Sequence, residues 1–222
     1  MKFTFNLNKK EFSMKKAKML SLTASLVLAI TFTLSCSSDD GDEGGGGGSC
    51  TNFKTVEIES SGFGRGSLTW MAENLNCNVE GSRCYKDDPE NCKKYGRLYD
   101  WNTALTACPS GWHLPTTSEW AGLIDRASII VGGKKEPGKK LKAKSGWSSS
   151  SNGTDEYGFS ALPGGRGTSG GYFENIGDAG YWWKNSPEGK YAYYVGLGYS
   201  NDVGENGVEK TYLLSVRCVK DH

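Results

Sequence analysis

The chain has 222 residues, of which 36% are hydrophobic and 12% aromatic, and its formal net charge is +1 at pH 7. This length and composition suit one globular domain of ordinary size with extensions. Residues 1–35 hold six lysines and one glutamate, and subtracting their net charge of +5 from the total leaves −4 for the remainder. A mildly acidic remainder lacks the basic surface that nucleic-acid binding requires, so we expect no nucleic-acid partner.

The N-terminal segment has the pattern of an export signal. A lysine-rich stretch at residues 15–18 precedes an apolar run, residues 19–34, of signal-peptide length. The run ends in "TLSC", which resembles a bacterial lipobox and implies cleavage before Cys36 and acylation of that cysteine. We therefore expect residues 1–35 to be a signal peptide, with Met14 as an alternative start. The other interpretation is an ordinary signal peptide followed by an incidental cysteine.

Residues 36–49 are predicted to be a tether. The stretch "SSDDGDEGGGGGS" is acidic and then pure glycine, and such a sequence has no apolar surface to bury. Acidic residues directly after a lipidated cysteine accompany display on the outer face in some bacterial groups. We expect an outer-membrane protein, held by its lipid anchor and facing the cell exterior.

The domain is predicted to span residues 50–222. It begins with a strand at 53–58, where apolar and polar residues alternate. The stretch "SLTWMAENL" then supplies core residues, and "YDWNTALTAC" favours a short helix with Asp100 or Asn102 as its N-cap.

The stretch "CPSGWHLPTTSEW" predicts the start of a second helix. Thr116 and Glu119 have the spacing of a capping box, and Pro115 and Trp120 stand at the staple positions. An apolar stripe at helical spacing follows, made of Trp120, Leu123, Ile124 and Ala127. The start of a helix therefore explains these residues without any catalytic role.

The second half of the domain is predicted to be rich in loops and strands. Residues 134–151 are basic and then serine-rich, which indicates an exposed loop. Residues 158–174 are punctuated by glycines that suit bends between short strands. Three aromatic and β-branched runs, at 179–184, 191–199 and 210–220, predict the closing strands. The order of elements is that of an α+β domain.

Six cysteines lie in this domain: Cys50, Cys77, Cys84, Cys92, Cys108 and Cys218. An even number in an exported chain indicates a disulfide framework, for which there are 15 formal pairings. Zinc binding is the alternative, but the chain has no CxxC pair and its two histidines are far apart in sequence.

Several long sequence motifs of the domain resemble those of one family. They are "TWMAENLN", "KYGRLYDWNTAL", "ACPSGWHLPTTSEW", "GFSALPGGRG", "GYWWK" and "SVRCVKD", and they occur in the order seen in the Fibrobacter succinogenes major paralogous domain. That family looks related to the C-type-lectin-like fold and to its formylglycine-generating-enzyme-like branch. The resemblance implies paired terminal strands, two helices beside a small twisted, mostly antiparallel sheet, and a long loop region.

The same resemblance implies how the cysteines pair. A bridge from the first helix to the last strand is typical of the lectin-like fold, which implies Cys108–Cys218. Cys84–Cys92 is then a local bridge within "CYKDDPENC", and Cys50–Cys77 remains.

The residues that could be catalytic or could bind a metal are better explained by roles in the fold. His113 has no assignable orienting carboxylate or nucleophile. Ser169 matches G-x-S-x-G without the strand and helix that a nucleophile elbow needs, and Lys140 stands where a P-loop requires Ser or Thr. Gly138 replaces an asparagine ligand of true calcium-dependent lectins, and "KDDPEN" or "NDVGEN" offers only a weak ion site. Cys218 alone cannot supply the reactive cysteine pair of formylglycine-type enzymes, so we expect no catalysis, no cofactor and no metal.

Aromatic residues late in the chain are the best candidates for ligand binding. Sugar rings stack on Trp and Tyr, and adjacent residues of a strand point to opposite faces, so one ring of the Trp182–Trp183 pair has the chance to be exposed. The candidates are Tyr181, Trp182, Trp183, Tyr194 and Tyr199. We expect a non-catalytic binding module for a polysaccharide or a cell-surface protein. The alternatives are a structural envelope protein without a discrete ligand and, least favoured, a formylglycine-type enzyme.

Overall fold

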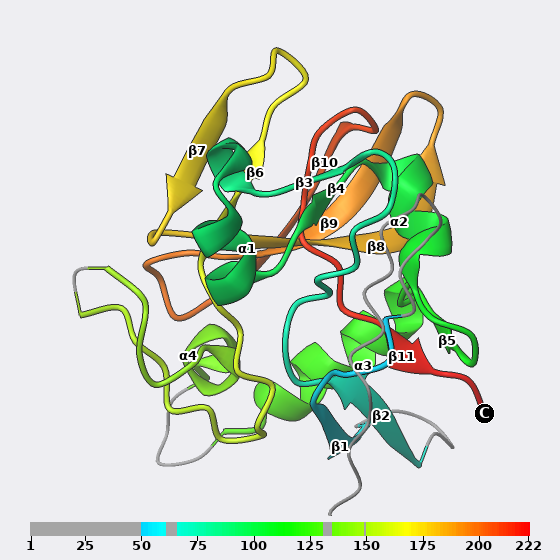
Figure 1. The fold of residues 1–222 in the computed structure, drawn as a ribbon. Helices are drawn as coiled ribbons and strands as arrows, with labels where there is room; N and C mark the ends of the chain where they lie inside the picture. The colour runs from blue at the N-terminus through cyan, green and yellow to red at the C-terminus, as the bar shows by residue number, and fades with distance from the viewer. Residues whose placement is uncertain (1–49, 61–65, 131–134, 149) are drawn as a thin grey trace, which may run out of the picture. The chain divides into compact units, whose positions relative to one another are not determined.

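The computed structural model describes residues 50–60, 66–130, 135–148 and 150–222 (Figure 1). The predicted signal peptide, Cys36 and the tether lie outside these residues. Within them the chain forms an α+β domain with a four-stranded sheet, a five-stranded sheet and a two-stranded sheet. The coarse fold class predicted from the sequence is therefore confirmed, although the strands form three sheets and not one small sheet.

The four-stranded sheet has the order β1-β2-β11-β5. Its strands are β1 (Thr55–Glu59), β2 (Ser67–Met71), β11 (Val219–Lys220) and β5 (Trp112–His113). The resemblance implied that the first and last strands pair with each other, and this prediction is wrong. Each of them pairs instead with β2, which lies between them. β2 takes this central place because three of its five residues, including Trp70, are buried.

The five-stranded sheet has the order β10-β9-β8-β6-β7 and is antiparallel except where β6 meets β8. Its strands are β6 (Gly164–Gly167), β7 (Phe173–Ile176), β8 (Gly180–Glu188), β9 (Tyr191–Leu197) and β10 (Val203–Glu209). The predicted strands at 179–184 and 191–199 correspond to β8 and β9. β10 was not predicted, because its glycines and exposed polar residues carry no strand pattern. β3 (Ser82–Arg83) and β4 (Leu98–Tyr99) form the two-stranded sheet.

Both helices expected from the sequence are present. Asp100 caps α2 through the Thr103 amide, and Thr116 and Glu119 form the predicted capping box of α3. Helix α1 was missed, although Asp88 caps it and Pro89 occupies its first position, as helix starts require. The helices are α1 (Pro89–Tyr95), α2 (Trp101–Ala107), α3 (Thr117–Ala127) and α4 (Pro137–Leu141), with a 3-10 turn, η1, at Tyr85–Asp87.

Three disulfides join Cys50 to Cys77, Cys84 to Cys92 and Cys108 to Cys218. These are the pairs that the family resemblance implied. The Cys108–Cys218 bridge closes a sequence separation of 110 residues, and the chain-entropy model assigns about 4–5 kcal/mol to a loop of that length. The bridge fixes the end of α2 to the C-terminal segment.

Asn74 is the centre of a buried polar network. Its Nδ2 donates to the carbonyl of Tyr95 at 2.8 Å, and its Oδ1 accepts from Trp182 Nε1 at 2.8 Å and Arg217 Nε at 3.0 Å. One buried amide thus joins the segment after β2, the end of α1, strand β8 and the C-terminal segment. Gly96 permits this approach, because a Cβ there would lie 2.7 Å from Asn74 Cβ, and its φ is +78°.

Arg217 is fully buried and supplies the positive charge of this network. Its remaining donors reach the carbonyls of Met71, Phe159 and Ser160, and its guanidinium lies 4.3 Å from the centre of the Phe159 ring. Burial lowers the pKa of Arg217 to about 9, which leaves the group charged at neutral pH. The charge is stabilised by oriented carbonyls and not by a carboxylate in direct contact.

The prediction of an exposed loop at 134–151 is wrong for its central part. Helix α4 lies there, and Lys140, Lys142 and Trp147 are buried. The aliphatic stem of a lysine packs well in a core when carbonyls receive its ammonium. Lys140 Nζ donates to the carbonyl of Ile129, and Lys142 Nζ has two carbonyl acceptors.

The predicted strand at 210–220 is regular only at its end, in β11. Before that, the backbone changes partner almost at each residue: Leu214 pairs with Tyr99, and the Ser215 amide bonds to the Tyr181 carbonyl. The segment lies between the sheets and cannot follow one of them. An apolar, β-branched run shows that a segment is buried but does not identify its partners.

We predict that Asn74→Ala destabilises the domain strongly. Trp182 Nε1 and Arg217 Nε would each lose a buried acceptor, at a cost of about 1–3 kcal/mol apiece. Urea denaturation of the oxidised protein measures the loss. Asn76→Ala is the matched control because Asn76 is exposed two residues away, and it should change the free energy of unfolding by less than about 0.5 kcal/mol. Equal transition midpoints for the two variants would refute the central role of Asn74.

Candidate functional site

The two tryptophans among the ligand candidates are core residues. Trp182 and Trp183 are both 0% exposed, although they point to opposite faces of β8. A hydrophobic cluster covers each face, one containing Trp182 and the other Trp183. Their indole N–H groups donate to Asn74 Oδ1 and to the carbonyl of Tyr99. With no accessible ring face, neither can stack on a sugar, so the expectation that one is exposed is wrong.

The structure brings two of the three candidate tyrosines together beside a hollow of about 290 Å³ on the β8–β9–β10 sheet. Tyr181 and Tyr194 line it, with ring centres 5.5 Å apart and planes at 83°. In the sheet register Tyr181 pairs with Gly196, and Gly196 pairs with Gly204. Cross-strand partners share a face of the sheet. The hollow therefore exists because two glycines follow Tyr181 across the sheet.

A carboxylate and an amide lie beside this hollow. Asp202 and Asn206 line it and are exposed, and Asn206 is the cross-strand partner of Tyr194. Glu205 also borders the hollow, but it lies on the opposite face of β10 in the sheet register, and its carboxylate is paired with Lys184. Burial raises the pKa of Tyr194, which keeps its phenol neutral. The sequence singled out "NDVGEN" only as a weak ion site. These polar residues were missed as partners of the tyrosines because β10 itself was not predicted.

Tyr199 lies in the bend between β9 and β10 and is 85% exposed. It lines a second hollow of about 600 Å³ with Ser148, Ser151, Asn175 and Asp178. The Nδ2 group of Asn175 donates to the Tyr181 hydroxyl at 2.9 Å, so a residue of the second hollow contacts a residue of the first.

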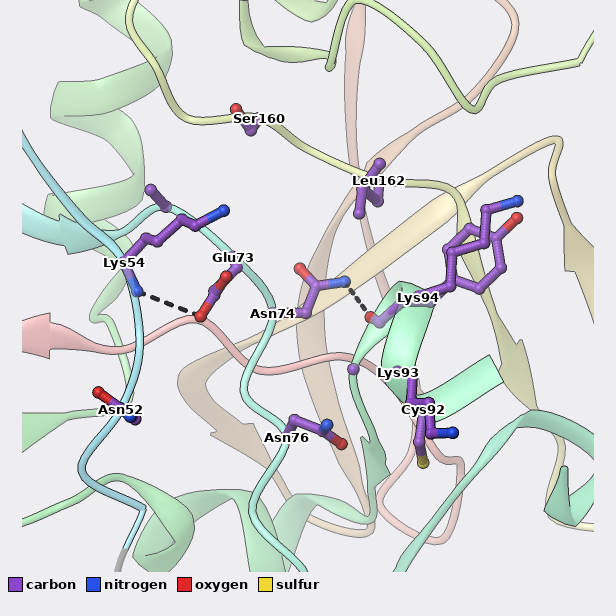
Figure 2. A pocket seen from close by; sticks show the side chains of 13 residues that line it. Asn52, Lys54, Glu73, Asn74, Asn76, Cys92, Lys93, Lys94, Ser160 and Leu162 are labelled. Carbon is purple, nitrogen blue, oxygen red and sulfur yellow. Dashed lines mark hydrogen bonds between the residues drawn. The ribbon is translucent and has the colours of Figure 1, made fainter. Parts of the chain in front are cut away.

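A polar cleft of about 470 Å³ lies between the N-terminal segment and the end of α1 (Figure 2). The Lys54 amide donates to Glu73 Oε1 at 3.1 Å on one side, and Asn74 contacts Tyr95 on the other. Asn74 is committed to the core through both ends of its amide. This cleft and the Tyr181–Tyr194 hollow each include a nearly buried tyrosine, because Tyr95 is 7% exposed in the first and Tyr194 is 8% exposed in the second. They differ in Tyr181, which is partly exposed, whereas this cleft contains no exposed aromatic ring. We therefore place the candidate ligand site on the face of the β8–β9–β10 sheet that carries Tyr181 and Tyr194, called the tyrosine face below, and not in this cleft.

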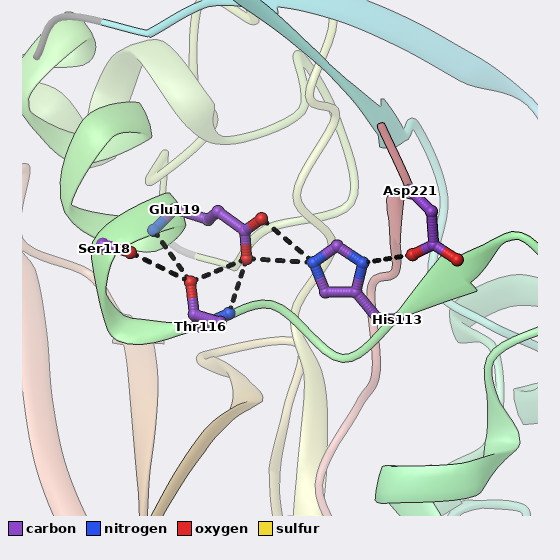
Figure 3. A network of polar contacts seen from close by, with 5 residues as sticks. All are labelled: His113, Thr116, Ser118, Glu119 and Asp221. Carbon is purple, nitrogen blue, oxygen red and sulfur yellow. Dashed lines mark hydrogen bonds and ion pairs between the residues drawn. The ribbon is translucent and has the colours of Figure 1, made fainter. Parts of the chain in front are cut away.

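His113 connects the C-terminal residues to helix α3 through hydrogen bonds (Figure 3). Its Nδ1 lies 2.6 Å from Asp221 Oδ1, and its Nε2 lies 3.0 Å from Glu119 Oε1. Glu119 also accepts from the Thr116 amide and hydroxyl as part of the capping box. Both ring nitrogens have carboxylate partners, which leaves neither available to activate a nucleophile. No pattern in the sequence indicates that His113 contacts Asp221, which lies 108 residues away.

The pKa values of this network are shifted. Burial opposes the charge on His113, but its hydrogen bonds to Asp221 and Glu119 outweigh burial and raise its pKa. Burial likewise opposes ionisation of Glu119, but hydrogen bonds from Thr116 and His113 lower the pKa of its carboxyl. The His113 contribution to stability is full below the ordinary histidine pKa of about 6.5 and is lost as pH rises through the raised value. The Glu119 contribution is lost when pH falls through its lowered pKa.

Among the described residues, no group of three or more His, Cys, Asp or Glu side chains could hold a metal ion. No helix in that same part of the chain has the length and apolar character needed to span a bilayer.

We predict that the free energy of unfolding of the native protein falls as pH rises above the ordinary histidine pKa of about 6.5, and that His113→Gln flattens this dependence. The charged imidazole between two carboxylates is the state that stabilises the fold. Chemical denaturation across this pH range measures it. An identical pH dependence in the variant would show that the network does not contribute.

The chain resembles one family of known proteins. The model of the Fibrobacter succinogenes major domain matches residues 65–220. No curated protein and no solved structure shows significant similarity to the chain. The matched range contains the Asn74–Arg217 network, His113 and the three tyrosines. Since the match covers more than half of the sequence, the chain belongs to the Fibrobacter succinogenes major domain family.

Proposed function

We propose that this protein is a non-catalytic binding module for polysaccharide at the cell surface. The observation that carries the proposal is the hollow lined by Tyr181 and Tyr194, with Asp202 and Asn206 beside it. Aromatic rings accept the apolar faces of sugars, while carboxylates and amides bond to hydroxyls. The floor of the hollow is formed by Gly196 and Gly204, which leave space for a sugar ring beside the tyrosines. A ligand could therefore bind without a large rearrangement of the sheet.

The finer fold proposal is a C-type-lectin-like domain. One feature supports it, the disulfide between the end of α2 and the C-terminal segment. Fold likeness alone does not transfer sugar binding, so the functional proposal depends on the tyrosine hollow.

For its location, we propose a lipoprotein anchored through Cys36 in the outer membrane and facing the exterior. The support is the sequence pattern: a lysine-rich start, an apolar run that ends at a cysteine, and an acidic glycine tether. Acyl chains contribute about 0.8 kcal/mol per buried CH₂, so two or three of them hold a protein on a membrane stably.

A binding role is favoured over formylglycine-type catalysis by the state of the cysteines. All six cysteines of residues 50–222 are in disulfides, and such chemistry needs a free thiolate. A structural envelope protein without a ligand would have no need for a hollow lined by aromatic and acidic residues.

We predict that the oxidised protein binds a neutral polysaccharide and that Gly204→Leu abolishes binding. A side chain at Gly204 meets only open space, with its nearest neighbour at 3.8 Å, so it would fill the hollow without disturbing the fold. Affinity electrophoresis against a panel of plant and bacterial polysaccharides, with and without calcium, measures binding.

Gly207→Leu is the matched control. Gly207 lies in the same strand on the opposite face, and a Cβ there has ordinary contacts, the nearest at 3.7 Å. This variant should bind like the native protein. Absence of binding to every polysaccharide by a folded native protein would contradict the proposal and favour a protein partner. Equal binding by both variants would place any sugar site elsewhere.

A further inference from the structure

The bend that carries Tyr199 is held by a buried ammonium group. Lys142 is 0% exposed, and its Nζ donates to the carbonyl of Gly198 at 2.8 Å and to that of Ser200 at 3.0 Å. These carbonyls flank Tyr199 on both sides. Lys142 Nζ also lies 4.9 Å from the centre of the Trp147 ring. No ion pair involves Lys142 within the described residues, and burial lowers the pKa of its amine.

A second set of contacts fixes the same bend. The Gly138 amide donates to the carbonyl of Asn201 at 2.8 Å, and the Asn201 amide side chain donates to Glu136 Oε1 at 2.9 Å. A Cβ on Gly138 would lie 2.6 Å from the carbonyl oxygen of Asp202. Figure 1 shows the orange chain after β9 beside the segment that carries α4. The bend is therefore supported along most of residues 198–202.

Tyr199 itself is not part of this support. It is 85% exposed, far more than a tyrosine that contributes to a core. Burying a charged lysine without a carboxylate is costly. Here the ammonium is satisfied by the two carbonyls that stand on either side of the exposed ring, which ties the backbone of the bend to Lys142. Rigid aromatic rings bind at a low entropic cost, which is the usual advantage of tyrosine in recognition surfaces.

The charge around the two hollows restricts the ligand. Asp178 lines the Tyr199 hollow and Asp202 lines the Tyr181–Tyr194 hollow, and neither is paired with a cation in the described part of the chain. The nearby cation Arg166 is already paired with Glu174 at 2.6 Å. Unpaired carboxylates attract hydroxyl donors and repel uronic acids and sulfated sugars.

We propose that Tyr199 forms a second sugar subsite, held in place by Lys142 as a positioning residue, so that the protein binds an extended neutral glycan chain and not a single terminal sugar. This proposal rests on the polysaccharide-binding function above and specifies its ligand. The first subsite is the Tyr181–Tyr194 hollow, and the Asn175–Tyr181 hydrogen bond joins the two. A chain that engages both subsites gains affinity through the covalent link between its sugars.

The test is titration calorimetry of the full oxidised chain with neutral gluco- and xylo-oligosaccharides from the disaccharide to the octasaccharide. Oligogalacturonides of equal length serve as the acidic comparison. We expect the affinity for neutral chains to rise with length until both subsites are filled, and acidic chains to bind more weakly. Tyr199→Ala should reduce the affinity for long neutral chains by about tenfold while leaving the shortest bound chains unaffected.

Tyr172→Ala is the control for removal of an exposed ring, because Tyr172 is 77% exposed and lies outside both hollows. It should leave affinity unchanged at every length. Lys142→Met tests positioning. It should reduce the affinity for long chains as Tyr199→Ala does, and should have no further effect in the Tyr199→Ala background. A merely structural lysine would weaken short and long chains alike and would act additively with Tyr199→Ala.

The outcomes separate the two proposals. If the native protein binds none of these oligosaccharides, the polysaccharide function fails and this inference fails with it. If short chains bind but affinity does not rise with length, or if Tyr199→Ala leaves long-chain affinity unchanged, the binding function stands and the second subsite is refuted. Tighter binding of oligogalacturonides would refute the neutral ligand.

Discussion

The fold depends on the buried hydrogen-bond network centred on Asn74 and Arg217. A buried guanidinium without a carboxylate in contact must satisfy its donors with oriented acceptors, and here these come from two separate segments, residues 71–74 and 159–160. Each acceptor is useful only if its segment is in place, which couples the sheets energetically. The same Asn74 oxygen receives Trp182, and through that contact the network extends to β8, the strand that carries Tyr181.

This network gives a physical reason for the sequence motifs by which the chain resembles its family. "WMAENLN" contains Asn74, "GFSALPGG" supplies the two carbonyls at 159 and 160, "GYWWK" contains Trp182, and "SVRCVKD" contains Arg217. The opening word of the second helix, "WHLPTTSEW", contains His113 and Glu119, which hold the chain end at Asp221. These motifs therefore contain the residues that hold the domain together. The residues proposed to bind a ligand lie mostly outside them, in β9, β10 and the bend between them.

The sequence predicted local structure well where one short pattern determines it. The capping box of α3, the Asp100 cap and the strands at β8 and β9 follow from propensity and spacing. It failed where burial depends on distant partners. Both tryptophans of β8 are buried because the sheet is covered on both faces, and Lys142 is buried because carbonyls 56 and 58 residues away receive it. The hollow was beyond prediction because it depends on the register that aligns Gly196 with Gly204.

The division between a fastened core and a ligand-binding face is tested most directly by amide chemical-shift mapping of the ¹⁵N-labelled oxidised protein during titration with a neutral oligosaccharide that binds. The account predicts that the amides of Gly196, Gly198 and Gly204 and those beside Tyr199 shift, while those of Asn76 and Lys93 in the polar cleft do not. Shifts concentrated in the polar cleft would contradict the account, because they would place the ligand over the core network and away from the tyrosine face.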